Sequence, residues 1–265
     1  MTQAASGIVT LLTDFGADDP YVGIMKGVVL SLHRGATLID LCHGVPPQNV
    51  ELGALWLAQG FGWFPAGTVH LAVVDPGVGS ARAALAARAG GHFFVGPDNG
   101  LLSRVASETE DFEARRLDAA ALGFPTPSRT FHGRDVFARV AALLAADARC
   151  FDALGPAHAP ARLALSPPFD DGRSARGRVL AVDRFGNLIT DLPGSWLERP
   201  HARVELGGRS FRPVGTYAEA GVGERVALTS SFGLVELSVQ NGSAAASLGL
   251  GPGAVVLLLS EGTSR

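Results

Sequence analysis

The sequence predicts an α/β amino-terminal domain with a mainly parallel sheet, followed by a small all-β barrel. Over residues 8–74, apolar β-branched runs alternate with amphipathic helical patterns, which is the order of a parallel sheet with crossover helices. After residue 177, short strand-like runs alternate with glycine-rich turns. Residues 167–176 have few apolar side chains and predict a linker between domains of residues 1–166 and 177–265.

The elements of the first domain follow from hydrophobic periodicity and from capping residues. Residues 8–13 form a continuous apolar, β-branched run, which predicts a buried strand. Pro20 suits the first turn of a helix, and Asn49 suits the N-cap of a second one. The predicted strands cover residues 8–13, 37–41, 68–74, 83–88 and 93–95, and the predicted helices cover about 20–33, 49–61 and 136–146.

The second domain is predicted to consist almost entirely of strands and turns. One hairpin is expected around the turn Asp183–Asn187, and another around the pair Gly207-Gly208, which is typical of a two-residue hairpin loop. The predicted strands cover residues 177–182, 188–191, 225–229, 234–239 and 254–259, together with the two arms of the hairpin over 204–211.

The composition indicates a globular protein without a nucleic-acid or membrane partner. Apolar residues make up 47% and charged residues 18% of the 265 residues, and the net charge of −3 offers no basic footprint. Residues 1–20 lack the pattern of a signal peptide, and the apolar run 254–259 is too short to span a bilayer. We expect a cytoplasmic protein in which Cys42 and Cys150 stay reduced, and the alternative that the sequence leaves open is a disulfide between them.

Several common cofactor and catalytic motifs are absent from the sequence. No Gly-x-Gly-x-x-Gly follows the first strand, and neither a P-loop nor a Gly-x-Ser-x-Gly elbow occurs. Asp-Phe-Gly at 14–16 lacks the other kinase motifs. The histidines show no metal-ligand spacing, so no metal is expected.

The stretch from Leu71 to Arg82 is the strongest candidate for chemistry. Asp75 ends a buried strand, and Pro76, Gly77 and Gly79 then force a tight turn. Open α/β sheets bind ligands outside the carboxyl ends of their strands, where Asp75 is expected to lie. Arg82 is near enough in sequence to fold back over Asp75, although Asp75 by itself could simply cap its turn.

Two further turns could contribute to the same cleft. Phe131-His-Gly-Arg-Asp135 precedes a predicted helix and supplies His132. The turn Gly96-Pro-Asp-Asn-Gly100 could present Asp98 or Asn99. We therefore take Asp75, Arg82 and His132 as candidate catalytic residues.

Acidic and aromatic residues elsewhere indicate a polar organic ligand. Asp14 and Asp19 bracket a strand-to-helix turn, where carboxylates could accept hydrogen bonds from a diol and an ammonium group, or could only complement the helix dipole. Asn187 could read an adenine edge while Phe185 and Tyr217 stack on the ring. The alternative for this second group is an ordinary Asx-type turn.

Seven motifs in one order carry a family resemblance. They are Thr-Asp-Phe-Gly at 13–16, Asp-Pro-Tyr-Val-Gly at 19–23, Val-Asp-Pro-Gly-Val-Gly at 74–79, Gly-Pro-Asp-Asn-Gly-Leu-Leu at 96–102, Phe-His-Gly-Arg-Asp at 131–135, Asp-Arg-Phe-Gly-Asn at 183–187 and Asn-Gly-Ser-Ala-Ala at 241–245. The series resembles the S-adenosylmethionine (SAM) hydroxide adenosyltransferases, relatives of the SAM-dependent fluorinase and chlorinase. The resemblance implies a homotrimer with SAM held between neighbouring subunits.

The resemblance also implies a role for each candidate residue. Asp75, Arg82 and His132 would activate water, and Asp14 would hold the ribose hydroxyls. The methionine end would be held by Asp19, Asp183 and Ser231. The adenine would be surrounded by Phe185, Asn187 and Tyr217, with the Asn241-Gly242 backbone nearby, and Tyr21 would also lie at the substrate. SAM is then the substrate, and no cofactor is implied.

The implied reaction is attack of water or hydroxide on the ribose C5′ of SAM, giving adenosine and methionine. The sequence leaves open whether Asp75 or His132 accepts the water proton. One alternative is a SAM-dependent halogenase, but a carboxylate at Asp75 would repel a halide. Another is a protein that binds SAM or adenosine without turnover, although binding alone does not require the Asp75, Arg82 and His132 set.

Overall fold

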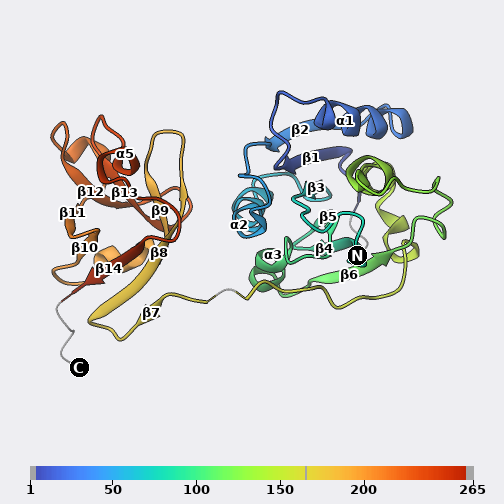
Figure 1. Ribbon diagram of the computed structural model, residues 1–265. Coiled ribbons are helices and arrows are strands. Elements are labelled where there is room, and N and C mark those ends of the chain that lie inside the picture. The colour runs from blue at the N-terminus through green and yellow to red at the C-terminus, as the bar shows by residue number, and fades with distance from the viewer. Residues whose placement is uncertain (1–3, 165, 261–265) are drawn as a thin grey trace. The chain divides into compact units, whose positions relative to one another are not determined.

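The computed structural model describes residues 4–164 and 166–260, and the chain divides into two compact units. Unit 1 ends at Ala164, the described part of unit 2 begins at Ser166, and each unit is described by itself. The predicted fold class is confirmed, because unit 1 contains a mainly parallel sheet with helices and unit 2 is a closed β-barrel (Figure 1). In these described ranges, no helix has the length and apolar character needed to cross a membrane.

Unit 1 is built on one sheet with the strand order β2-β1-β3-β5-β4-β6. Strands β2, β1, β3 and β5 run parallel, whereas β4 is antiparallel to both β5 and β6. The strand bounds are β1 Ile8–Thr13, β2 Thr37–Cys42, β3 Val69–Val73, β4 Ala84–Ala89, β5 His92–Pro97 and β6 Glu113–Leu117.

Helices cover both faces of this sheet, because the central strands are apolar on both sides. Their bounds are α1 Tyr21–Leu32, α2 Val50–Phe61, α3 Ser103–Glu108 and α4 Ala138–Ala146. Helices α1 and α4 pack together over one face, where Met25 and Val29 meet Leu71 and Val73. Helices α2 and α3 cover the other face. Asn49 caps α2, as predicted, by accepting a hydrogen bond from the backbone N–H of Leu52.

This topology brings candidate residues to one edge of the sheet. Parallel strands end at the same edge, so Asp14, Asp75 and Asp98 follow β1, β3 and β5 there. Strand β4 runs the opposite way and therefore begins at this edge, directly after Arg82 and Ala83.

Unit 1 also contains elements that the sequence did not predict. Strand β6 was missed because it pairs with β4 at the margin of the sheet and carries charged side chains such as Glu113 and Arg115. Helix α3 is short and has no side-chain cap. The helix expected from residue 136 begins earlier, with the π-helical turn η1 Gly133–Phe137, and a 3₁₀ turn, η2 Ala148–Ala153, follows α4.

Unit 2 closes into a barrel. In the described part of the chain, the strands are β7 Phe169–Asp170, β8 Ser174–Val182, β9 Leu188–Pro193, β10 Arg203–Leu206, β11 Arg209–Pro213, β12 Arg225–Thr229, β13 Leu234–Val239 and β14 Val255–Leu259. Pairing of β14 with both β8 and β10 closes the ring over a core that includes Phe211 and Leu237. The short helices are η3 Gly194–Glu198, η4 Tyr217–Glu219 and α5 Ala244–Leu248.

The segment 167–176 is more ordered than the predicted linker. Strand β7 lies within it and pairs with β8, which itself begins at Ser174. Asp171 makes the connecting turn, because its side chain accepts hydrogen bonds from the backbone N–H groups of Arg173 and Ser174. The many polar residues of this stretch therefore build a turn rather than an irregular connection.

Two buried histidines make the stability of unit 1 depend on pH. His70 Nδ1 lies 2.8 Å from Thr10 Oγ1, and its Nε2 lies 3.2 Å from His92 Nδ1. Burial, assisted by His92, lowers the pKa of His70 from 6.5 to about 3, and burial also lowers the pKa of His92. The unfolded chain thus binds more protons than the folded one between pH 6.5 and about 3.

We predict that the free energy of unfolding falls as the pH decreases from 6.5 towards 3, by roughly 1.4 kcal/mol per unit of pKa difference at most. Urea unfolding at a series of pH values measures this slope. His70→Gln keeps hydrogen-bonding groups but does not titrate, so it should make the slope shallower. An unchanged slope in a folded His70→Gln variant would contradict the assignment.

Candidate functional site

Asp75 and Arg82 form a buried ion pair at the end of β3. Arg82 Nε donates to Asp75 Oδ1 at 2.8 Å, and Arg82 Nη2 donates to Asp75 Oδ2. The two side chains are only 5% and 8% exposed. The turn between them is closed by backbone hydrogen bonds from Val78 to Asp75 and from Ser80 to Gly77. This bidentate arrangement fixes the plane of the guanidinium.

His132 joins the pair through the other side of Arg82 Nη2, which lies 2.9 Å from His132 Nδ1. A guanidinium has no acceptor, so Nδ1 must be the acceptor and the ring proton lies on Nε2. Burial, and then the charge of Arg82, lower the pKa of His132, against opposing contributions from Asp75, Asp135 and the Ser128 backbone. The imidazole is therefore neutral at neutral pH.

Close backbone packing holds the turn of Asp75 and Arg82 against the turn that precedes His132. Gly79 has φ +77°, and a Cβ at this position would lie 2.3 Å from the carbonyl oxygen of Arg129, just before His132. Asn99 Nδ2 donates to the carbonyl of Val74 at 2.8 Å and so fixes the backbone next to Asp75. Asp98 points elsewhere, because it accepts from His158 Nε2 and from the backbone of Ala161.

Asp14 lies at the same edge, at the end of β1. Its Oδ2 accepts from the backbone N–H of Gln48 at 2.8 Å. Asp19 is exposed in the loop before α1. Tyr21 is 46% exposed and packs with two rings that were not predicted, Phe15 at 5.8 Å and Phe131 at 5.3 Å between ring centroids. Both rings belong to the motifs that contain Asp14 and His132, which is the signal that could have found them.

In unit 2, the side chain of Asp183 closes its own turn. Its Oδ1 accepts from the backbone N–H groups of Phe185 and Asn187, and its Oδ2 accepts from Asn187 Nδ2 at 2.9 Å. The alternative of an Asx-type turn therefore describes the local geometry. The turn leaves the ring of Phe185 80% exposed, whereas Asn187 is buried.

Tyr217 lies against a buried carboxylate that the sequence did not single out. Its hydroxyl donates to Glu236, which also accepts from Ser238 Oγ at 2.8 Å. Burial and this hydrogen bond raise the pKa of Tyr217 to about 12, with a smaller contribution from the charge of Asp183. Glu236 is a buried charged residue on the mostly buried strand β13. Its charge within the run 234–239 is the sequence signal that could have identified it.

The Asn241-Gly242 segment lies beside the Asp183 turn, but Ser231 does not. Gly186 has φ +85° and packs on Ser243, and its carbonyl accepts from the N–H of Ala245 at 3.0 Å. Ser231 is in the turn before β13, whereas Asn241 follows the other end of that strand. Pairing of Leu234 with Pro193 and of Leu237 with Leu188 places Ser231 at the opposite end of β9 from Asn187.

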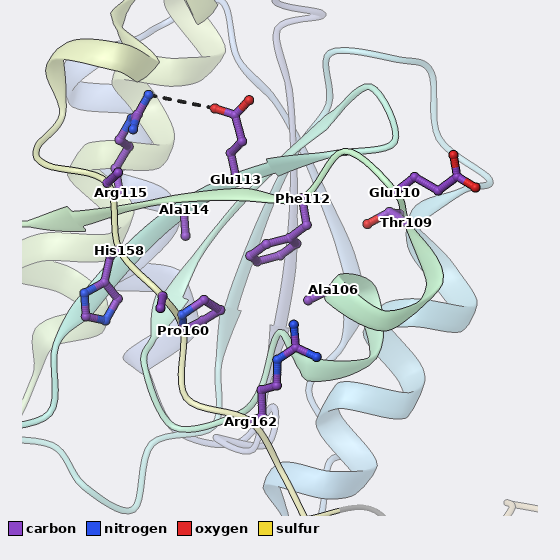
Figure 2. Close-up of a pocket in the computed structure, with 12 residues that line it drawn as sticks. Ala106, Thr109, Glu110, Phe112, Glu113, Ala114, Arg115, His158, Pro160 and Arg162 are labelled. Atoms are coloured by element: carbon purple, nitrogen blue, oxygen red, sulfur yellow. Dashed lines mark ion pairs between the residues drawn. The ribbon is translucent and has the colours of Figure 1, made fainter.

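The cavities of unit 1 include one at this edge and one away from it. One of about 520 Å³ is lined by Arg82, Ala84 and His132. The other, of about 700 Å³, lies between α3, β6 and the segment 157–162, with Phe112 and Arg162 in its wall (Figure 2). Arg82 and His132 are not among the residues that line the larger cavity.

Two family models match the chain over most of its length. The N-terminal domain of the SAM hydroxide adenosyltransferases matches residues 9–155, and the C-terminal domain matches residues 177–257. The chain belongs to the SAM hydroxide adenosyltransferase family. The family predicted from the seven motifs is thus confirmed.

Named relatives and a solved structure agree with this membership. The chain is 41% identical over 259 residues to the (R)-S-adenosyl-L-methionine hydrolase of Thermus thermophilus, covering 95% of this chain and 99% of the relative. It is 27% identical to a fluorinase of an Actinoplanes species, covering 90% and 92%. The crystal structure of an uncharacterized conserved protein from Thermotoga maritima matches with a TM-score of 0.88 and 33% identity, covering 95% and 99%.

The close approach of Gly79 to the Arg129 carbonyl can be tested by substitution. We predict that Gly79→Ala lowers the free energy of unfolding by roughly 1–3 kcal/mol, because it combines a strained positive φ with a backbone clash. Urea unfolding measures the loss. Gly123→Ala is the matched control, since Gly123 has φ +69° but nothing within 4 Å of an added Cβ. Equal losses in both variants would show that the contact with Arg129 contributes nothing.

Proposed function

We propose that this protein is a SAM hydrolase, which transfers the 5′-deoxyadenosyl group of SAM to water and releases adenosine and L-methionine. The observation that carries the proposal is the buried guanidinium of Arg82, held by Asp75 on one side and by neutral His132 on the other. Family membership and 41% identity to named hydrolases support the same activity. The fluorinase relatives are more distant, and the Asp75 carboxylate would oppose a halide at this position.

The chemical difficulty of this reaction lies in the nucleophile. The sulfonium of SAM is already a good leaving group, whereas bulk water has a pKa near 15.7. Arg82 Nη1 donates one N–H to the carbonyl of Ala83 at 3.2 Å, so its second N–H remains to bind the attacking water. A fixed, buried positive charge at this point stabilises the developing hydroxide without reorganisation.

Asp75 is the better candidate for the proton acceptor. The acceptor nitrogen of His132 is occupied by Arg82, so His132 cannot take a proton from water without breaking that contact. Each carboxylate oxygen of Asp75 accepts one hydrogen bond from Arg82 Nε or Nη2 and keeps further acceptor capacity. The water on Nη1 lies across the guanidinium from Asp75, so its proton would reach Asp75 through a second water. His132 then acts by holding Arg82 in place.

Substrate binding is divided between the two units in this proposal. Asp14 would bind the ribose diol, Asp19 would lie at the methionine end, and Tyr21 would also contact the substrate. In unit 2, Phe185, Asn187 and Tyr217 would surround the adenine together with the Asn241-Gly242 backbone. Asp183 and Ser231 stay the proposed contacts of the methionine end, and they lie at opposite ends of β9. No metal or other cofactor takes part in the proposed step.

We predict that Asp75→Asn, Arg82→Ala and His132→Ala each lower kcat by about 10²–10⁴-fold while the affinity for SAM changes little. The three groups act on the nucleophile as one unit, so the Asp75→Asn/His132→Ala double variant should be little worse than the more damaging single variant. Chromatography of adenosine and methionine measures turnover, and calorimetry measures SAM binding. In water labelled with oxygen-18, the wild type should place the label at O5′ of adenosine.

Arg149→Ala is the matched control, because Arg149 forms an ion pair with Asp147 on the exposed surface. Wild-type kcat in a folded Arg82→Ala variant would end the hydrolase assignment of this site. Adenosine without the label would exclude direct attack of water at C5′.

The proposed active form is a cytoplasmic homotrimer in which unit 1 of one subunit and unit 2 of its neighbour share each SAM site. We predict that light scattering gives the mass of three chains. Co-expression of a His132→Ala chain with an Asn187→Ala chain should recover activity, because some shared sites in the hybrids then carry neither substitution. Sites formed within one chain would always carry one defect, so the absence of recovery in mixed oligomers would overturn the shared-site proposal.

A further inference from the structure

The cavity beside Arg82 lies on a different part of the sheet edge from the proposed ribose site. Along this edge the strand order is β2-β1-β3-β5-β4-β6. Asp14 follows β1, and Asp75 follows β3. The cavity is lined by Ala84, at the start of β4, and by Leu117, at the end of β6. The Asp75–Arg82 pair therefore stands between the region of Asp14 and the cavity.

The lining of the cavity suits water better than an organic ligand. The buried side chain of Arg82 and the half-buried His132 are polar groups in its wall, and small or rigid residues such as Ala84, Ala119 and Pro127 form much of the rest. Charged Arg116 and Asp118 also line it and are exposed to solvent. A volume of about 520 Å³ has room for on the order of ten waters at about 30 Å³ each.

We propose that this cavity delivers the nucleophilic water to Arg82 and carries away the released proton, along a route separate from that of SAM. The proposal rests on the hydrolase function above. Displacement at C5′ requires the water to approach opposite to the sulfur, and SAM bound beside Asp14 would block access from its own side. The cavity reaches Arg82 from the other side.

The contacts of Arg82 fit an approach of water from the cavity. Its Nη1 points to the carbonyl of Ala83, a residue that also lines the cavity. The second N–H of Nη1 can therefore hold a water that comes from the cavity. Nε and Nη2 are occupied by Asp75 and His132.

The step balances without any further reactant. One O–H bond of water breaks as the C5′–O bond forms, and the C5′–S bond breaks with its electron pair remaining on the methionine sulfur. The proton passes through a second water to Asp75, and from there through water beside Arg82, which lines the cavity, to solvent. The cationic sulfonium becomes a neutral thioether, so one proton leaves for each turnover.

Filling the cavity with a side chain tests this route. Ala119→Trp should lower kcat by about 10- to 100-fold while the KM and the calorimetric affinity for SAM stay unchanged, because only the supply of water is obstructed. Ala119→Ser leaves the cavity open and should turn over SAM normally. Ala159→Trp is the matched control, since Ala159 lines the larger cavity of Figure 2, where Arg82 and His132 do not contribute.

The wild type is assayed first, and failure to form adenosine from SAM would reject the hydrolase function itself. With an active wild type, normal kcat in a folded Ala119→Trp variant would overturn the water route. A raised KM with unchanged kcat would also overturn it, because the cavity would then bind SAM. Ala84→Leu narrows the cavity from β4 and replaces Ala119→Trp if thermal melting shows that the tryptophan variant does not fold.

Discussion

The bidentate contact between Arg82 and Asp75 is the interaction on which the candidate site depends. Both side chains are almost fully buried, and a buried ion pair overcomes its desolvation cost only with good geometry and further hydrogen bonds. Here those bonds come from the Ala83 carbonyl and from His132. The ring of Phe137, with its centroid 5.3 Å from the Arg82 guanidinium carbon, adds a cation–π contact. One guanidinium thus ties together the turn after β3, the start of β4 and the helix η1.

The surrounding backbone explains why this contact can form. Parallel strands deliver Asp14 and Asp75 to one edge of the sheet, and the antiparallel β4 returns Arg82 to the same edge. Gly79 lets the chain pass close to Arg129, which brings the His132 turn within reach. Asn99 holds the carbonyl of Val74 from the next loop. The site is therefore assembled from turns. Their geometry depends on Gly79, which allows a close backbone approach, and on the side-chain amide of Asn99, which fixes the backbone beside Asp75.

Much of this architecture could be predicted from the sequence, because its determinants are local. The buried strands β1 and β3 are continuous apolar runs, and the turn after β3 carries its own proline and glycines. The burial and the hydrogen-bond partners of charged side chains could not be predicted in the same way. The buried carboxylate of Glu236 accepts hydrogen bonds from Tyr217, which is 19 residues away in sequence, and from Ser238 on its own strand. The residue pattern around Glu236 does not reveal these contacts.

The separation of Ser231 from Asn187 has a similar cause. It depends on the antiparallel register of β9 and β13, which neither strand reveals by itself. Strand β6 was not predicted because it is an edge strand that carries charged side chains. An edge strand need not be apolar when these side chains form ion pairs, as Arg115 does with Asp152. The family resemblance implied the chemical roles of individual residues. The structure added the contacts through which Arg82 could hold the attacking water.

Because the barrel is closed, its architecture does not depend on the point of the ring at which the chain begins and ends. Ser174 pairs with Leu259, and the N–H of Ser260 donates to the carbonyl of Arg173 at 2.8 Å, so the chain enters and leaves the barrel at neighbouring points. A circular permutant that joined these points and opened the exposed Gly207-Gly208 turn would keep the strand neighbours from β8 to β14. The unit has the properties of an insertable module, which can be placed in a loop of another protein without pulling its ends apart.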